Sequence, residues 1–244
     1  MKTFIYLISI LIYILSNCDS VEASRKSRQE YEKTGHVIWD IKTNEKMVAL
    51  TFDDGPNPVY TPQILDLLAH YNAKATFFVI GSEADRNTSI IKREYREGHE
   101  IALHTYHHVY NFHSNKAEFK YELKKEANTI KRITGGYNPS LYRPVAGRIN
   151  DFIVQNSIKN GYTVIMWSWH QDTRDWESPG TNKIINQVIS NTRPGDIIIF
   201  HDSGGDRKQT VKALKKILEF YNKTGYKCVT VSEMLFRSKS IIPQ

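Results

Sequence analysis

The amino-acid sequence predicts an α/β fold in which about seven parallel strands form a barrel covered by helices, within a single domain. Segments typical of strands alternate with segments typical of helices from residue 36 onward. Without its first 23 residues, the chain of 244 residues keeps enough length for one domain. Reactive side chains follow five different strands, as in a barrel, whereas an open sheet gathers its ligand at one point.

Each element is assigned from its hydrophobic pattern and from the turn residues that bound it. A short apolar segment at 36–41 comes first. Strands are expected at 47–52, 75–80, 100–103, 141–143, 162–167, 196–200 and 227–231. Helices are expected at 62–70, 90–97, 116–133, 151–160, 182–191 and 209–221. This alternation predicts a mostly parallel sheet, because parallel strands need a crossover connection such as a helix.

The first residues predict an export signal at 1–23, since Lys2 precedes an apolar run at 4–15 that is too short to span a bilayer. A small-residue cleavage site ends at Ala23. The alternative is a lipobox, with an unusual residue before its cysteine, that would make Cys18 a lipid anchor. Both endings predict an extracytoplasmic protein that is secreted or associated with the cell envelope.

After the signal, residues 24–35 predict a polar linker, 36–238 the catalytic domain and 239–244 a tail. Removing 1–23 raises the formal net charge from +7 to +8, which suits an anionic surface such as a cell wall. The basic residues are scattered, without an arginine stripe interleaved with aromatics, so no nucleic-acid partner is expected. We expect a monomer that meets a membrane only through its leader or a lipid anchor. Cys228 alone remains in the mature chain, which excludes an internal disulfide.

Two carboxylates stand where the first long strand stops, in Thr51-Phe52-Asp53-Asp54-Gly55-Pro56. Neighbouring residues of an extended chain point to opposite sides, so Asp53 and Asp54 can serve as a general base and a metal ligand. His104 and His108 follow the third strand four residues apart, on one face if the segment turns helically, and with Asp54 they form a three-ligand set that suits catalytic zinc. Cobalt and nickel bind the same donor atoms. His107 is the alternative to His108.

Further candidate residues follow the later strands. His201 is interpreted as a general acid, because a histidine pKa lies near neutrality and the metal ligands are already supplied. Asp172 and Asp175 offer carboxylates to orient that histidine, and Trp176 offers an aromatic wall. Arg143 stands at the head of a loop ending in glycine, where a guanidinium can meet a buried carboxylate and N–H groups can face a substrate.

Together these motifs resemble those of the polysaccharide deacetylases of carbohydrate esterase family four, in the same order and with similar spacing over roughly residues 36 to 237. The matching segments are Thr51 to Pro56, His104 with His108, Arg143 to Gly147, Asp172 to Trp176, and Ile199-Phe200-His201. The resemblance implies a distorted (β/α)7 barrel and metal-dependent removal of acetyl groups from N-acetylated sugars.

The resemblance also implies a role for each site residue. The metal ligands are Asp54, His104 and His108. Asp53 is the general base, oriented by Arg143, and His201 is the general acid, tuned by Asp175.

On the substrate side, the resemblance implies that Trp176 and Ile199 line the pocket for the acetyl methyl group. Ala146 stands where the family often has an aromatic side chain that forms a wall of the substrate groove. This difference is expected to affect how the substrate is bound. Its backbone N–H can still serve as the oxyanion donor. Ile199 replaces a usual leucine, a change of nearly equal volume.

The expected function is hydrolytic N-deacetylation of N-acetylglucosamine units in a polysaccharide, with peptidoglycan as the favoured substrate and chitin oligomers next. One alternative is an O-acetyl esterase that acts on xylan-like glycans, which would release acetate without a new amine. The other is a non-catalytic module that binds the cell wall, which would bind glycan and release no acetate.

Overall fold

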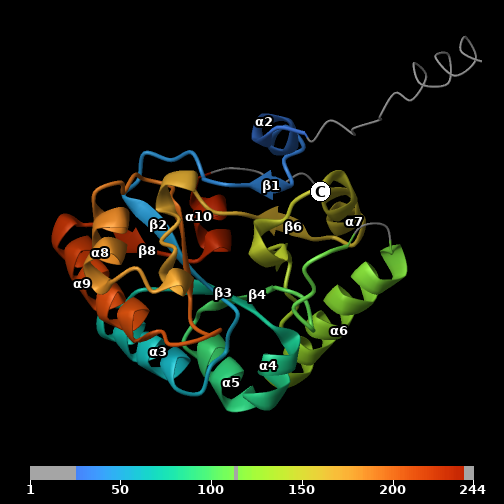
Figure 1. Cartoon of the computed structure of the whole chain (residues 1–244), viewed down its shortest axis with the longest axis horizontal. Helices are drawn as coiled ribbons and strands as arrows, with labels where there is room; N and C mark the ends of the chain where they lie inside the picture. The colour runs from blue at the N-terminus through green and yellow to red at the C-terminus, as the bar shows by residue number, and fades with distance from the viewer. Residues whose placement is uncertain (1–25, 113–114, 239–244) are drawn as a thin grey trace, which may run out of the picture.

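The computed structural model describes residues 26–112 and 115–238, in which one curled sheet is surrounded by helices (Figure 1). The strands are β1 (Val37–Ile38), β2 (Met47–Asp53), β3 (Ala75–Val79), β4 (Glu100–Leu103), β5 (Leu141–Tyr142), β6 (Thr163–Ile165), β7 (Ile197–His201) and β8 (Lys227–Cys228). They lie in the order β1-β6-β5-β4-β3-β2-β7, with β8 beside β2, and every pairing is parallel. An antiparallel bridge between Asp40 and Asp196 connects the two ends of this order. The predicted distorted (β/α)7 barrel is confirmed.

The helices surround the sheet and account for its crossovers. They are α2 (Arg28–Glu32), α3 (Tyr60–His70), α4 (Gly81–Arg86), α5 (Thr88–Arg96), α6 (Lys116–Thr134), α7 (Asp151–Lys159), α8 (Thr181–Ile189), α9 (Lys208–Thr224) and α10 (Val231–Arg237). Short 3-10 turns lie at η1 (Val145–Gly147), η2 (Trp169–Gln171) and η3 (Asp175–Glu177). Every strand and helix expected from the sequence has a counterpart that begins within two residues of its expected start. The helices α2, α4 and α10 were not expected.

Alternation along the strands divides the core into two layers. Along β2, Val48 and Leu50 pack with the outer cluster beneath the helices, whereas Met47 and Ala49 pack with the inner cluster. Since side chains alternate between the two faces of a strand, Asp53 shares the inner face with Met47 and Ala49. The same alternation puts His201 on the face of Ile197, which belongs to the inner cluster. The sheet therefore delivers both side chains to the inside of the barrel, at its carboxyl end.

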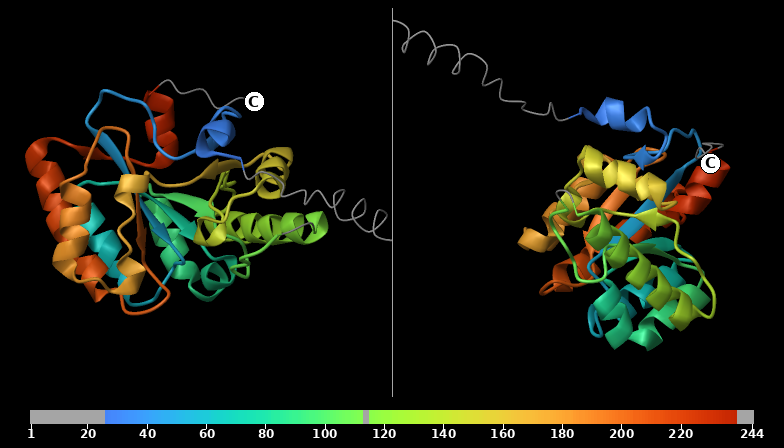
Figure 2. Two further views of the ribbon diagram at one scale, coloured as in Figure 1. Left: turned by 45° about the horizontal axis from the view of Figure 1, so that its top comes forward. Right: turned by 90° about the vertical axis from the view of Figure 1, so that its right-hand side faces the viewer.

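The expected linker at 24–35 differs from the structure, in which α2 lies outside the sheet beside β1 (Figure 2). Ser27 and Glu30 form a reciprocal capping box at its start, and Tyr31 is 3% exposed within the outer core cluster. The capping box stabilises this short helix, and Tyr31 attaches it to the domain.

The predicted export signal with Cys18 and the predicted tail at 239–244 lie outside the described residues. Within 26–112 and 115–238, no helix is long and apolar enough to cross a membrane.

Candidate active site

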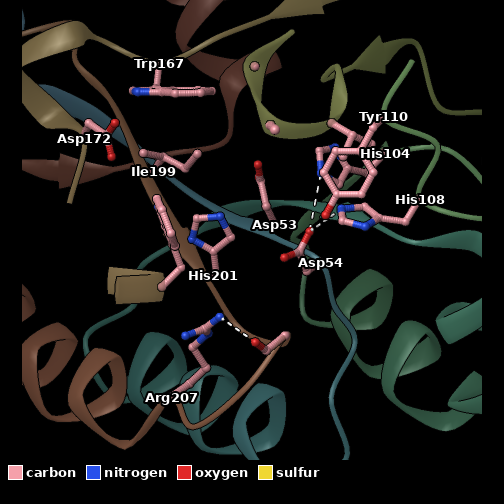
Figure 3. A pocket seen from close by; sticks show the side chains of 15 residues that line it. Asp53, Asp54, His104, His108, Tyr110, Trp167, Asp172, Ile199, His201 and Arg207 are labelled. Carbon is pink, nitrogen blue, oxygen red and sulfur yellow. Dashed lines mark hydrogen bonds and ion pairs between the residues drawn. The ribbon is translucent and has the colours of Figure 1, made fainter. Parts of the chain in front are cut away.

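The carboxyl ends of the strands surround a pocket of about 460 Å³ whose walls carry most of the predicted site residues (Figure 3). The predicted residues on its lining are Asp53, Asp54, His104, His108, Ala146, Asp172, Trp176, Ile199 and His201. Arg143 and Asp175 lie behind this lining and contact it through Asp53 and His201. The structure thus brings together residues that are up to about 150 positions apart in the sequence.

Asp53 ends β2 and is 3% exposed. Its Oδ1 accepts a hydrogen bond of 2.6 Å from Nη1 of Arg143, a fully buried residue that also donates to Oγ1 of Thr51 at 2.8 Å. The remaining guanidinium donors bind the carbonyl oxygens of Ile165 and Met166 at 3.0 and 2.9 Å. With every branch of the guanidinium bound, the Asp53 carboxylate is fixed in one orientation.

His201 ends β7 and is the register partner of Asp53 on β2. Its Nδ1 lies 2.7 Å from Oδ1 of Asp175, which is 1% exposed and also accepts from the hydroxyl of Thr210. Burial lowers the pKa of His201, but the hydrogen bond and charge of Asp175 raise it more, to about 9. The imidazole is therefore protonated at neutral pH, as a proton donor requires, and its Nε2 is left for the pocket.

Asp54, His104 and His108 form a compact donor set in which one ligand atom from each lies within 4.8 Å of the others. Oδ1 of Asp54 is 3.5 Å from Nε2 of His104 and 3.1 Å from Nε2 of His108. Burial raises the pKa of Asp54, but the two imidazoles lower it more, to well below its usual range. Asp53 lies between this set and His201 (Figure 3).

The two histidines are brought together by an irregular loop, not by the helical turn that the sequence suggested. Thr105 and His108 have positive φ angles of 74° and 57°, so the segment is neither a helix nor a strand. Two buried carboxylates of α6 hold this loop. Glu126 accepts from the backbone N–H of His104 at 3.0 Å, and Glu122 accepts from that of His107 at 2.8 Å.

The loop also separates His107 from the donor set. Nδ1 of His107 lies 2.7 Å from Oε1 of Glu122, on the side of α6, and His107 is not among the residues of the cluster. Of the two alternatives, the geometry favours His108.

Comparison with known proteins identifies the family to which the chain belongs. The family model described as polysaccharide deacetylase matches residues 40–165, slightly more than half of the chain. The chain belongs to the polysaccharide deacetylase family. A peptidoglycan-N-acetylglucosamine deacetylase of Bacillus cereus is 47% identical over 208 residues, which are 85% of this chain and 97% of that protein.

Solved structures of deacetylases and esterases share the fold. The crystal structure of the peptidoglycan N-acetylglucosamine deacetylase Bc1960 matches with a TM-score of 0.80 and 35% identity, over 86% of this chain and 96% of that one. A family 4 acetyl xylan esterase from Clostridium thermocellum, in complex with a cobalt ion, matches with a TM-score of 0.72 and 30% identity, over 80% and 93% of the chains.

The donor set fits the metal on which deacetylases of this family depend. Nδ1 of His104 lies 2.8 Å from the carbonyl oxygen of Arg143, which can only accept, so Nδ1 carries a proton and Nε2 is the nitrogen that can bind a metal. Two imidazole nitrogens and a charged carboxylate oxygen are donors typical of a catalytic divalent metal that keeps an open position. These residues can thus hold zinc, cobalt or nickel.

The substrate side of this deacetylase pocket differs in part from the sequence analysis. Ile199 is buried and Trp176 is half-exposed at the pocket, as a lining requires. Ala146 is exposed and has a φ of 53°, a left-handed conformation that is unfavourable for a residue other than glycine and recurs at functional sites. Tyr110 and Trp167 also line the pocket and were not predicted.

Arg207 is a third lining residue that the sequence analysis missed. The one available signal was the pair of glycines at 204 and 205, which places the arginine in a turn just after the strand that carries His201.

The metal site predicts different results for two neighbouring histidines. We expect His108→Ala to weaken zinc binding by more than the roughly 10- to 100-fold that is typical of losing an outer-shell partner, because it removes a donor atom. His107→Ala removes contacts with Glu122 and Tyr106 but no donor atom of the set, so zinc affinity should change less than about tenfold. Titration of the chelator-treated protein with zinc measures both. Equal losses for the two variants would contradict the assignment of His108.

The His201–Asp175 pair predicts a pH dependence. Because the pKa of His201 is about 9 in the folded protein and 6.5 in the unfolded chain, the pair stabilises the fold fully below about pH 6.5 and this contribution is lost as the pH rises through about 9. In Asp175→Asn, the pKa of His201 should fall, because the hydrogen bond and charge of Asp175 are the largest causes of its rise, so the alkaline loss of activity should begin at lower pH. NMR titration of the metal-free protein and a pH–rate profile measure these shifts. Glu177→Gln, on the same turn, is the control, and an unchanged alkaline limb in Asp175→Asn would contradict the pairing.

Proposed function

We propose that this polysaccharide deacetylase hydrolyses the N-acetyl group of N-acetylglucosamine units in a glycan, with release of acetate and a free amine. The observation that carries the proposal is the position of Asp53, between the Asp54–His104–His108 donor set and His201 (Figure 3). A base and an acid on two sides of one pocket suit a reaction that takes a proton from water and gives one to nitrogen.

The chain's residues divide the chemistry between them. When bound, the metal supplies polarisation of the acetyl carbonyl and a lowered pKa for water. Asp53, held by Arg143, accepts the proton of the attacking water. The backbone N–H of Ala146 donates a hydrogen bond to the oxyanion that develops.

His201 completes the reaction as the general acid. Breaking the C–N bond requires a proton on nitrogen, because an amide anion is a poor leaving group, and Nε2 of His201 donates it. Asp175 keeps the imidazole protonated and oriented until that step. Ile199 and Trp176 exclude water from the side of the acetyl methyl group.

Peptidoglycan is the proposed substrate, ahead of chitin oligomers. The peptidoglycan deacetylases among the similar proteins support this choice, as does a net charge of +8 once residues 1–23 are removed. The proposal includes residues 1–23 as an export signal, an extracytoplasmic location, zinc as the resident metal and action as a monomer. An O-acetyl esterase is the second candidate, supported by the similarity to an acetyl xylan esterase.

The test measures acetate and primary amine together, with the protein from Ser24 to Gln244 acting on purified peptidoglycan and on N-acetylglucosamine oligomers. We expect equal amounts of both products, abolished by chelator and restored by zinc. Asp53→Asn should keep its zinc and lose at least about a hundredfold in rate, as is typical when a general base is removed.

Three outcomes would contradict the proposal. Acetate without amine, from acetylated xylan, would identify the esterase. Glycan binding by zinc-loaded protein without any acetate would identify a wall-binding module. Near-normal turnover by zinc-loaded Asp53→Asn would remove Asp53 from the role of base.

A further inference from the structure

Arg207 is a charged residue of the pocket that the proposed chemistry leaves unused. It lies directly before α9, six positions after His201, and is 3% exposed, yet it lines the same pocket as Asp53 and Asp54. Figure 3 shows its side chain beyond His201, on the far side from Asp53. It is the one lysine or arginine on the described lining, which also carries three aspartates.

The guanidinium is held in place by the backbone, and no carboxylate of the described residues forms an ion pair with it. Nε donates to the carbonyl oxygen of Ser203 at 2.6 Å, and Nη2 donates to that of Gly204 at 3.1 Å. Among residues 26–112 and 115–238, no carboxylate lies within ion-pair distance of Arg207, and Nη1 has no hydrogen-bond acceptor. A buried cation without a counter-charge is unfavourable, so this position favours an anionic ligand.

Gly204 places this cation close to the catalytic centre. A Cβ atom on Gly204 would lie 3.2 Å from Oδ2 of Asp54 and 3.3 Å from Nη2 of Arg207, so the glycine separates the two groups by little more than its own width. Its φ of +76° also favours glycine. The guanidinium therefore lies beside the point where the proposed reaction turns a neutral amide into a carboxylate.

We propose that Arg207 is the core of a carboxylate-binding site in the catalytic pocket, here called the Arg207 site. The inference rests on the proposed function and deepens it. The carboxylate has two sources: the acetate that the reaction releases, or an acidic group carried by the glycan next to the sugar that is deacetylated. Nη1 supplies the charge-assisted hydrogen bond, while the two backbone carbonyls keep the guanidinium in position.

Calorimetric titration of the zinc-loaded protein separates the two sources. The ligands are sodium acetate, a neutral N-acetylglucosamine oligomer and a soluble peptidoglycan fragment that carries carboxylates. The proteins are the wild type, Arg207→Gln and a control, Arg174→Gln, which removes the same charge from an exposed side chain that pairs with Glu177. If the site binds acetate, Arg207→Gln lowers the affinity for acetate at least about tenfold. The affinities for the neutral and the carboxylated glycan then change by the same factor.

If the site binds the glycan, Arg207→Gln lowers the affinity for the carboxylated fragment about tenfold. The affinities for the neutral oligomer and for acetate are then unchanged. Affinities equal to those of the wild type for all three ligands, in a folded Arg207→Gln, would overturn the proposal. So would equal losses in the Arg174→Gln control. Binding of acetate to the metal gives a residual affinity for acetate that is the same in every variant.

A measurement on the wild type covers the case in which Arg207→Gln does not fold. The Nε–H signal of Arg207 in the ¹⁵N NMR spectrum, assigned through its contact with Ser203, should shift on titration with acetate or with the carboxylated fragment. No shift at saturation by both ligands would overturn the proposal. Because these are binding measurements, they separate failure of the Arg207 site from failure of the deacetylase assay.

Discussion

Arg143 holds the catalytic end of the barrel together, because its guanidinium joins β2 to β5 and β6, two strands that do not pair with β2. It follows β5, donates to Asp53 at the end of β2, and binds two carbonyl oxygens at the end of β6. Its Cζ also lies 4.0 Å from the ring centroid of Phe78 on β3. A fully buried charge is tolerated only when its donors are bound, and breaking such a pair typically costs about 3–5 kcal/mol. The arrangement that orients the base therefore also fixes how the strands meet.

The three carboxylates to which the proposed reaction assigns roles each have a separate partner. Asp53 pairs with Arg143, Asp175 pairs with His201, and Asp54 faces His104 together with His108. Without these partners, clustered carboxylates would repel one another and take up protons. The pairing with Asp175 keeps the acid His201 protonated at neutral pH, and the pairing with Arg143 orients the base Asp53 in the same pocket. Arg207 departs from this pattern, which is why a ligand is the natural source of its counter-charge.

The sequence predicted the parts of the fold that repeat along the chain. The apolar run of β2 ends at two aspartates, and strand alternation alone assigns Asp53 to the inner face. The short helices α2 and α10 escaped prediction because five to seven residues are too few to show a helical period. The capping box of Ser27 and Glu30 was the one local signal for α2.

The exact shape of the site could not be predicted, because it depends on contacts between distant segments. The loop from His104 to His108 takes its form from Glu122 and Glu126, which lie on a helix further along the chain. No local pattern predicts positive φ angles at Thr105 and His108. In the same way, the burial of Arg207 depends on the turn that precedes it, and the sequence analysis did not find this residue.

The most direct test of this account is a double-variant cycle on the acetate release rate, with Asp53→Asn, Arg143→Lys and the two combined, each checked for folding and zinc content. If Arg143 acts by holding Asp53, the combined variant should be no slower than Asp53→Asn alone. Rate losses that multiply would contradict the account, because Arg143 would then contribute to the reaction by a route that does not pass through Asp53.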